Sequence, residues 1–255
     1  MWRFRVRTIA VAAAFAAFAA SAAPAQILED VTVVSVPSAG VLPHGGYLFH
    51  GNLGPASSIL GSAAVGFFDR LMLGASFGLQ DVIGRGDMSV NDRIGLQARL
   101  RVVEETVTRP AFTLGIDTQG EGRYIESEDR YERKSRGLFL VVGKNYRLID
   151  DLSLNGGINY SFENRDESGV NLFAGVDIGI VRWMSLLLDY DAALDDNSES
   201  AATSRTRGRG YLDTGIRLDY RENLRFKILF KDLLGNYEPE TGVYRSIEVW
   251  YVNVF

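Results

Sequence analysis

Residues 224–231, Leu-Arg-Phe-Lys-Ile-Leu-Phe-Lys, decide the fold of this chain because apolar side chains recur in them at every second position. Successive side chains of a β-strand point to opposite sides of a sheet. The segment therefore predicts a strand with one apolar face and one cationic face. The apolar positions are Leu224, Phe226, Ile228 and Phe230, and the cationic positions are Arg225, Lys227 and Lys231.

The same alternation recurs along the chain in segments of about ten residues, separated by turn-forming or charged residues. An even number of strands would leave both ends of the barrel domain on one side of a membrane, and ten or fourteen strands would also satisfy this condition. No repeat of solenoid or propeller length is visible, so we expect one domain. The predicted strands, about twelve, lie at residues 45–53, 59–68, 71–80, 93–103, 109–117, 136–146, 152–162, 169–180, 184–193, 209–220, 223–232 and 243–255.

Alternation alone also fits a soluble sandwich, in which each strand buries one face and wets the other. Two features favour a membrane barrel. The apolar faces run for about ten residues, the length that a tilted membrane strand needs, and the connections alternate between short and long, as in outer-membrane barrels. We therefore predict an all-β fold, a single transmembrane antiparallel up-and-down β-barrel of about twelve strands in the outer membrane of a Gram-negative bacterium.

The last predicted strand supports the barrel because it ends at an aromatic residue. Tyr251 and Phe255 share its apolar face, and this ending resembles the C-terminal signal that the barrel assembly machinery reads. Asn253 departs from the pattern because an apolar residue would be expected there. The alternative is a chain that happens to end in phenylalanine.

The N-terminus is typical of an exported protein. Residues 1–25 combine a basic start with an alanine-rich apolar run, which predicts a signal peptide cleaved before Gln26. The alternative is a membrane anchor, but the run is short for a span of about 20 residues. We expect a periplasmic N-terminal segment at 26–44 and the outer-membrane barrel at 45–255.

Composition excludes several classes of protein. The chain has no cysteine, which excludes disulfide scaffolds, cysteine-ligated zinc and lipid-anchored lipoproteins. Its formal net charge is −5 and becomes more negative without the signal peptide, so nothing favours nucleic-acid binding. We expect no cofactor and no bound metal. The expected partners are outer-membrane lipids, lipopolysaccharide and the barrel assembly machinery.

Three short motifs carry a family resemblance. They are the segment Val-Pro-Ser-Ala-Gly-Val-Leu-Pro-His-Gly at 36–45, the segment Arg-Pro-Ala-Phe-Thr-Leu-Gly-Ile-Asp at 109–117, and the segment Val-Val-Gly-Lys-Asn-Tyr at 141–146. Over residues 36–190 the chain resembles YjbH-like outer-membrane proteins. The resemblance implies a barrel associated with exopolysaccharide production or export, and a polysaccharide as a partner. The chain is much shorter than the large multi-domain members of that family.

Charged side chains alternate with apolar ones on many predicted strands, which places them on the inner face of the barrel. One interpretation is a charged pore that steers polar or anionic solutes. The other is an internal network of ion pairs that fills a narrow lumen, because a buried charge needs a partner. The predicted lumen charges are Asp117, Asp177, Asp189, Asp191, Asp213, Asp219, Arg93, Arg99, Arg101, Arg217, Arg225 and Lys227.

Catalytic chemistry has little support, and we predict no catalytic residues. His44 and His50 are the only histidines, and only His50, near Asn52 and Ser57 or Ser58, suggests a hydrolase arrangement. No nucleophile-elbow sequence surrounds any serine. A histidine of the lumen or of a loop is the simpler interpretation.

Two loop features fit surface loops better than binding sites. The acidic stretches 195–199 and 126–132 offer oxygen ligands to Ca²⁺, but neither has the spacing of a defined calcium loop. The Arg-Gly-Asp triplet at 85–87 is of a kind that arises by chance.

These patterns leave three functional hypotheses. The first is a conduit or export-associated barrel for polar solutes or exopolysaccharide. The second is a structural or surface-interaction barrel with a plugged lumen, and the third is a membrane-embedded hydrolase. An open lumen would favour the first hypothesis, and an occluded lumen the second.

Overall fold

A computed structural model of the chain describes residues 29–54, 58–80, 82, 89–91, 93–147, 151–163, 168–196, 206–237 and 242–255. The predicted signal peptide at 1–25 and the Arg-Gly-Asp triplet lie outside these residues. Within them, no helix is long and apolar enough to cross a membrane.

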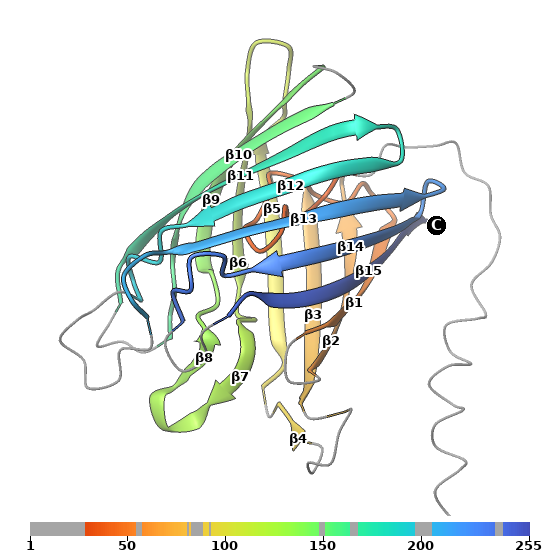
Figure 1. Cartoon of the computed structure of the whole chain (residues 1–255). Helices are drawn as coiled ribbons and strands as arrows, with labels where there is room; N and C mark the ends of the chain where they lie inside the picture. The colour runs from red at the N-terminus through yellow and green to blue at the C-terminus, as the bar shows by residue number, and fades with distance from the viewer. Residues whose placement is uncertain are drawn as a thin grey trace, which may run out of the picture.

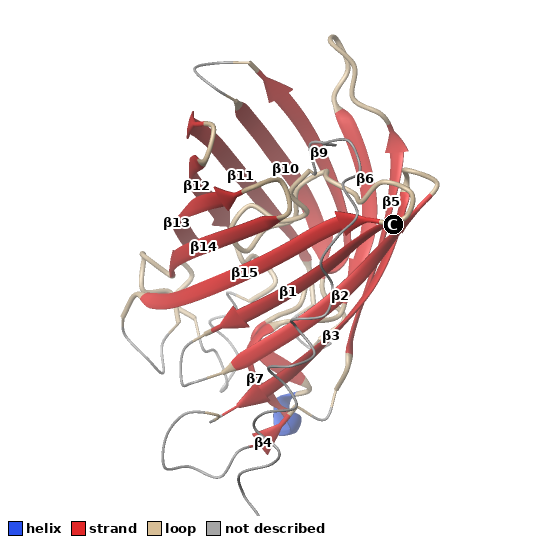
Figure 2. Ribbon diagram, turned by 90° about the vertical axis from the view of Figure 1, so that its right-hand side faces the viewer, coloured by secondary structure: helices blue, strands red, loops and turns tan. Residues whose placement is uncertain are grey.

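The main sheet closes on itself as an antiparallel barrel of twelve long strands, which confirms the predicted fold class and strand number (Figure 1). The first and last strands close the ring, with Tyr47 opposite Asn253 and Leu53 opposite Ile247. β9 and β10 meet at Gly137 and Tyr160. Figure 2 shows the closing strand β15 beside β1, which β2 and β3 follow in order. The twelve strands are β1 (Gly46–Leu53), β2 (Ile59–Phe67), β3 (Leu71–Gln80), β5 (Gly95–Val103), β6 (Ala111–Asp117), β9 (Gly137–Tyr146), β10 (Leu152–Tyr160), β11 (Val170–Val181), β12 (Met184–Asp191), β13 (Tyr211–Tyr220), β14 (Leu224–Lys231) and β15 (Tyr244–Val254).

Short elements add to one end of the barrel. β4 (Ser89–Val90) pairs with β3. The long connection between β6 and β9 holds an antiparallel hairpin of β7 (Glu121–Ile125) and β8 (Arg130–Arg133), with a 3-10 turn at Glu126–Glu128. The acidic stretch 126–132, which we expected to be a plain surface loop, therefore forms part of this outer hairpin. Figure 1 shows β4, β7 and β8 together at the lower end of the barrel. Outer-membrane barrels place their long connections on the extracellular side, and we assign this end to that side.

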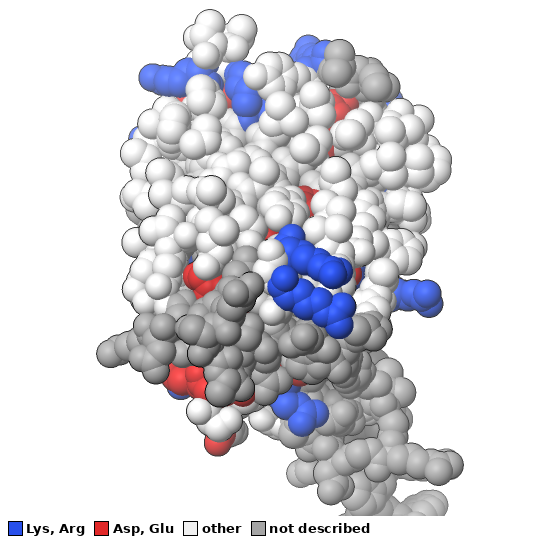
Figure 3. Space-filling view, turned by 60° about the vertical axis from the view of Figure 1, so that its left-hand side comes forward, with Lys and Arg blue, Asp and Glu red and all other residues white. Residues whose placement is uncertain are grey.

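The outer face of the barrel is apolar, as a lipid-facing surface requires. On β12 and β14 the outward side chains of Leu186, Leu188 and Ile228 are exposed, whereas Leu187 and Leu229 between them are buried inside. Figure 3 shows a largely uncharged outer surface over the upper half of the molecule, with lysine and arginine at its rim. The strand alternation predicted from residues 224–231 is therefore present in the structure.

The N-terminal residues that precede β1 lie inside the barrel. Val33, Val34 and Val36 are buried and belong to a cluster with Phe173 of β11 and Leu187 of β12. Figure 1 shows this segment, in red and orange, between opposite walls of the barrel. We expected residues 26–44 to be a separate segment in the periplasm, and the described part of it instead fills the lumen. The physical reason is that its valines find apolar surface inside the barrel, which the strand pattern does not reveal.

The lipid-facing assignment predicts that a charge in the middle of β12 is costly. Replacing Leu188 with arginine should lower the free energy of unfolding in lipid vesicles by about 2–4 kcal/mol, because the new charge would lie in hydrocarbon. The matched control is Val181→Arg at the periplasmic end of β11, which should cost at most about 1 kcal/mol. Urea titration monitored by tryptophan fluorescence measures both changes. Equal costs at the two positions would contradict the assignment.

Candidate functional site

Residues 29–43 form a narrow hairpin, which we call the plug hairpin. Thr32 pairs with Pro37 in an antiparallel bridge. The backbone N–H of Val33 donates to the carbonyl of Val36 at 3.0 Å, and the N–H of Ser38 donates to the carbonyl of Val31 at 3.1 Å. The hairpin enters from the end of the barrel where β1 begins, and its tip at 33–36 lies deepest in the lumen.

A single carboxylate on the wall holds the tip. Asp189 of β12 accepts hydrogen bonds from the backbone N–H groups of Val34, Ser35 and Val36 at 3.0, 2.7 and 2.9 Å. Asp189 is 2% exposed. Three backbone N–H groups converge on one carboxylate oxygen, so Asp189 forms a latch for the tip.

Two deeply buried cations hold the stem of the hairpin by its carbonyl groups. The Arg99 guanidinium of β5 donates to the carbonyls of Val31 at 2.5 Å and Ser38 at 3.3 Å. On the opposite wall, the Lys227 Nζ of β14 donates to the carbonyls of Thr32 at 2.9 Å and Val33 at 3.1 Å. Arg99 is 1% exposed and Lys227 is 0% exposed. The stem therefore supplies the polar partners that buried cations require.

Carboxylates at the start of the hairpin pair with other wall cations. Asp30 lies 2.5 Å from both Arg217 and Arg225. Glu29 forms a bidentate ion pair with Arg101, which also donates to the carbonyl of Ala39 at 2.9 Å. These contacts anchor the part of the plug hairpin that is nearest the periplasmic end.

Glycines on the inner wall make room for the hairpin. A Cβ on Gly175 of β11 would lie 2.9 Å from methyl groups of both Val33 and Val36, and a Cβ on Gly143 of β9 would lie 2.6 Å from the Cβ of Ala39. Larger residues at these positions would force the hairpin away from the wall, because packed interiors have little spare room.

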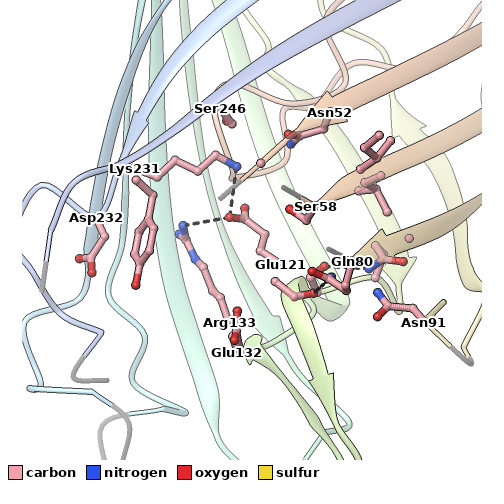
Figure 4. A pocket seen from close by; sticks show the side chains of 18 of the residues that line it. Asn52, Ser58, Gln80, Asn91, Glu121, Glu132, Arg133, Lys231, Asp232 and Ser246 are labelled. Atoms are coloured by element: carbon pink, nitrogen blue, oxygen red, sulfur yellow. Dashed lines mark hydrogen bonds and ion pairs between the residues drawn. The ribbon is translucent and has the colours of Figure 1, made fainter. Parts of the chain in front are cut away.

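The outer hairpin docks on the rim through a cluster of ion pairs (Figure 4). The Glu121 carboxylate lies 3.1 Å from Lys231 of β14 and 3.9 Å from Arg133. Arg133 also binds Asp213 at 2.6 Å and Asp191 at 3.2 Å. Burial raises the pKa of Glu121, but Lys231 and Arg133 outweigh it and lower that pKa to about 2. Glu121 therefore stays ionised, and the outer hairpin stays docked, across the ordinary pH range.

In the described part of the chain, cavities lie along the lumen on both sides of the plug hairpin. A mouth cavity and an inner cavity share the lining residues Asn52, Gln119, Glu121 and Lys231, so they adjoin each other on the extracellular side of the plug hairpin. A periplasmic cavity lies on the other side and is lined by residues 29–30 of the hairpin and by Arg217. The plug hairpin separates the inner cavity from the periplasmic cavity, because it lines both.

The structure places the predicted lumen charges as follows. Arg93 lies before β5 in an exposed connection, where its guanidinium binds Asp129 at 2.7 Å and covers the ring of Tyr124. The strand begins two residues later than we expected, so the alternation does not extend to Arg93. The other predicted lumen charges occupy inward positions of their strands, namely Asp117, Asp177, Asp189, Asp191, Asp213, Asp219, Arg99, Arg101, Arg217, Arg225 and Lys227.

Several residues of the site were not predicted from the sequence. Glu29 and Asp30 carry no pattern that distinguishes them from surface residues. Arg133 and Glu121 belong to a connection without strand alternation. Lys231 was visible beforehand, because it continues the cationic face of β14.

The predicted assembly signal lies at the closing seam. Phe255 follows β15, and its backbone N–H donates to the carbonyl of Gly45 at 3.0 Å. Its ring lies 4.6 Å from the ring of Tyr47, which is also close to Tyr251. The role of Tyr251 and Phe255 in assembly remains a prediction.

His50 contacts a different serine from those considered above. Its Nδ1 atom lies 3.2 Å from the Ser62 hydroxyl, its Nε2 atom lies 3.6 Å from Glu248, and its ring stacks on Trp250 at 4.0 Å. Ser58 makes no such contact in the described structure, and Ser57 lies outside the described residues. The backbone around Ser62 is paired in strands on both sides, which leaves no N–H pair to stabilise an oxyanion there. This part of the chain therefore gives a hydrolase no support.

Comparison with known proteins finds similarity only among solved structures. No family model matches the chain, and no curated protein matches it, so the resemblance to YjbH-like proteins and its link to exopolysaccharide are not supported. The chain is similar to the KdgM porin, with 12% identity and a TM-score of 0.46 over 81% of this chain and 98% of that chain. It is also similar to an outer membrane channel from Pseudomonas putida F1, with 16% identity and a TM-score of 0.43 over 84% of this chain and 97% of that one. These neighbours are porins and channels, but at such low scores the likeness carries no argument about activity.

If Asp189 holds the tip of the plug hairpin, its removal should let the hairpin leave the wall faster. The chain has no native cysteine, and Val36 is fully buried, so Val36→Cys should react slowly with a bulky maleimide. Adding Asp189→Ala should speed labelling about 10- to 100-fold, because it removes three hydrogen bonds that hold the tip, each worth about 0.5–1.5 kcal/mol. The matched control is Asp117→Ala, since Asp117 contacts Gln97 and Gln119 and not the hairpin. An unchanged rate with Asp189→Ala would show that Asp189 does not hold the tip.

Proposed function

We propose that this protein is an outer-membrane channel for small polar solutes and that the plug hairpin closes it in the described conformation. The observation that carries the proposal is the position of the hairpin between cavities on its two sides. All its contacts with the wall are non-covalent, so it can leave without breaking a bond of the chain.

Polar side chains along the inner cavity support passage of polar solutes rather than a purely structural interior. Asn52, Gln97, Asp117 and Glu248 line the inner cavity. A barrel whose interior serves only stability can fill it with packed side chains, as the smallest barrels do. Here a separate segment, which precedes β1, fills the central part.

A plugged structural barrel is the second candidate function. The number of polar contacts that hold the hairpin favours it, because Asp189, Arg99, Lys227 and Arg101 all bind the same short segment. In this alternative the hairpin never leaves, and the loops at the extracellular rim carry the function. For a role with exopolysaccharide, the described structure offers no support other than the polar side chains of the lumen.

A reversible covalent lock distinguishes the two candidates. A Cβ on Gly175 would lie 3.2 Å from the Cβ of Val33, a few tenths of an ångström less than the roughly 3.5–4.5 Å of a disulfide. A small shift of the hairpin away from the wall would therefore allow the bond. The experiment uses the full chain with Asp189→Ala, Val33→Cys and Gly175→Cys in planar lipid bilayers. We expect no conductance under oxidising conditions and stepwise conductance after a reducing agent is added, because only the reduced hairpin can leave the lumen.

The control carries Asp189→Ala and Gly175→Cys without the second cysteine, and it should conduct with or without reductant. Folding of each variant is checked by the heat-dependent shift of the barrel in gel electrophoresis. A folded double-cysteine variant that stays silent after reduction would overturn the channel and favour the plugged structural barrel.

A further inference from the structure

The charged side chains of the barrel that bind the plug hairpin are mostly cations. Six cations bind it in the described structure. Two come from β5, three come from β13 and β14 on the other side, and the sixth is Arg136, which precedes β9 and donates to the carbonyl of Ser35 at 3.2 Å. Among the described residues, one acidic side chain of the wall, Asp189, binds its backbone. The hairpin thus occupies a site built mainly from positive groups, which are Arg99, Arg101, Arg136, Arg217, Arg225 and Lys227.

Arg99 and Lys227 depend on the hairpin most. In the described structure Arg99 has no carboxylate within ion-pair distance, although Asp117 of β6 attracts it at longer range. Its hydrogen bonds go to carbonyls of the hairpin. Lys227 lies 3.9 Å from Asp30 of the hairpin, and Glu248 of β15 faces it in the strand register. Its hydrogen bonds go to carbonyls of the hairpin. A buried cation without a polar partner is strongly unfavourable. When the hairpin leaves, these two groups need water or an anion in its place.

The other acids of the wall are already engaged with cations or amides of the wall. Asp191 binds Arg136 at 2.6 Å, and Asp219 binds Arg217 at 3.0 Å and Arg225 at 3.1 Å. Departure of the hairpin also removes the carboxylates of Glu29 and Asp30 from the lumen. The vacated space therefore becomes more positive by two charges near its periplasmic end, while Asp189 at the tip is the one wall acid that loses its partners.

We infer that the lumen vacated by the plug hairpin is a binding site for small anions, and that the hairpin occupies it as an internal substitute for such a solute. Carboxylates and carbonyls of the hairpin take the positions that the carboxylates of the solute would take between Arg99 and Lys227. This inference rests on the proposed channel, and it names the class of solute as small organic anions that carry two or more carboxylates.

Competition with the hairpin tests the site without any need for conduction. The probe is citrate, and the readout is maleimide labelling of Val36→Cys in the full chain folded in detergent. Citrate should speed labelling in a saturable way, because it displaces the hairpin, while spermidine and mannitol at matched ionic strength should not. Arg99→Gln and Lys227→Gln should each raise the citrate concentration for half-maximal effect about tenfold. The control is Arg182→Gln, which makes the same change in an exposed periplasmic turn.

Ion selectivity supplies the second readout. Reversal potentials of the open channel in a KCl gradient should show a preference for chloride, and Arg99→Gln or Lys227→Gln should reduce it while Arg182→Gln leaves it unchanged. Two lumen variants are used so that misfolding of one leaves the other to decide.

The outcomes separate the two proposals. Conductance with a preference for potassium, together with labelling that citrate does not affect, would overturn the anion site and leave the channel standing. Saturable competition by citrate in a barrel that never conducts would overturn the channel and keep the anion site. Equal effects of citrate and spermidine would show a general salt effect and would also overturn the anion site.

Discussion

Charges that line the interior of a membrane barrel need partners, and much of this molecule follows from that constraint. A ring of twelve strands encloses a lumen between the filled interior of eight-stranded barrels and the open channel of porins. Its wall presents Arg99 and Lys227, both fully buried. The plug hairpin supplies carbonyl groups to both and carboxylates to their neighbours. It therefore fills the lumen and compensates its charge at the same time.

The same constraint separates the two ends of the lumen. On the extracellular side, charges of the outer hairpin and the rim pair with each other around Arg133 and Glu121, and a polar space remains open to the mouth. On the periplasmic side, cations of the wall pair with residues 29–30. The molecule thus carries a fixed set of ion pairs at one end and a set that depends on the plug hairpin at the other.

The sequence predicted the barrel well because strand alternation is a local property. Each of the predicted strands is present, and residues 224–231 show why, since Leu224 to Lys231 alternate between lipid and lumen in the structure. Arg93 shows the limit of the method, because it precedes the first paired residue of β5 and points into an exposed connection. Alternation indicates which face a residue occupies only where the strand has already begun.

The position of the plug hairpin inside the lumen could not be predicted from the sequence, and the reason is physical. Its partners lie far along the chain, as Val34 and Asp189 are separated by 155 positions, and a lumen offers no pattern that marks which segment will enter it. The valine-rich stretch at residues 31–36 also carries no signal that distinguishes a segment inside the lumen from a segment in the periplasm. The inward position of Asp189 was predictable, but its role as a latch for backbone N–H groups was not.

The plug hairpin is joined directly to the barrel, because β1 begins at Gly46, three residues after the hairpin ends. About 15 extended residues span roughly 50 Å, so a displaced hairpin still reaches its site in the lumen. Return is then an intramolecular event, governed by an effective concentration in the millimolar range for a short tether. Closure of the lumen would not depend on how many copies of the protein the membrane holds, and a competing solute would have to reach a comparable concentration to keep the lumen open.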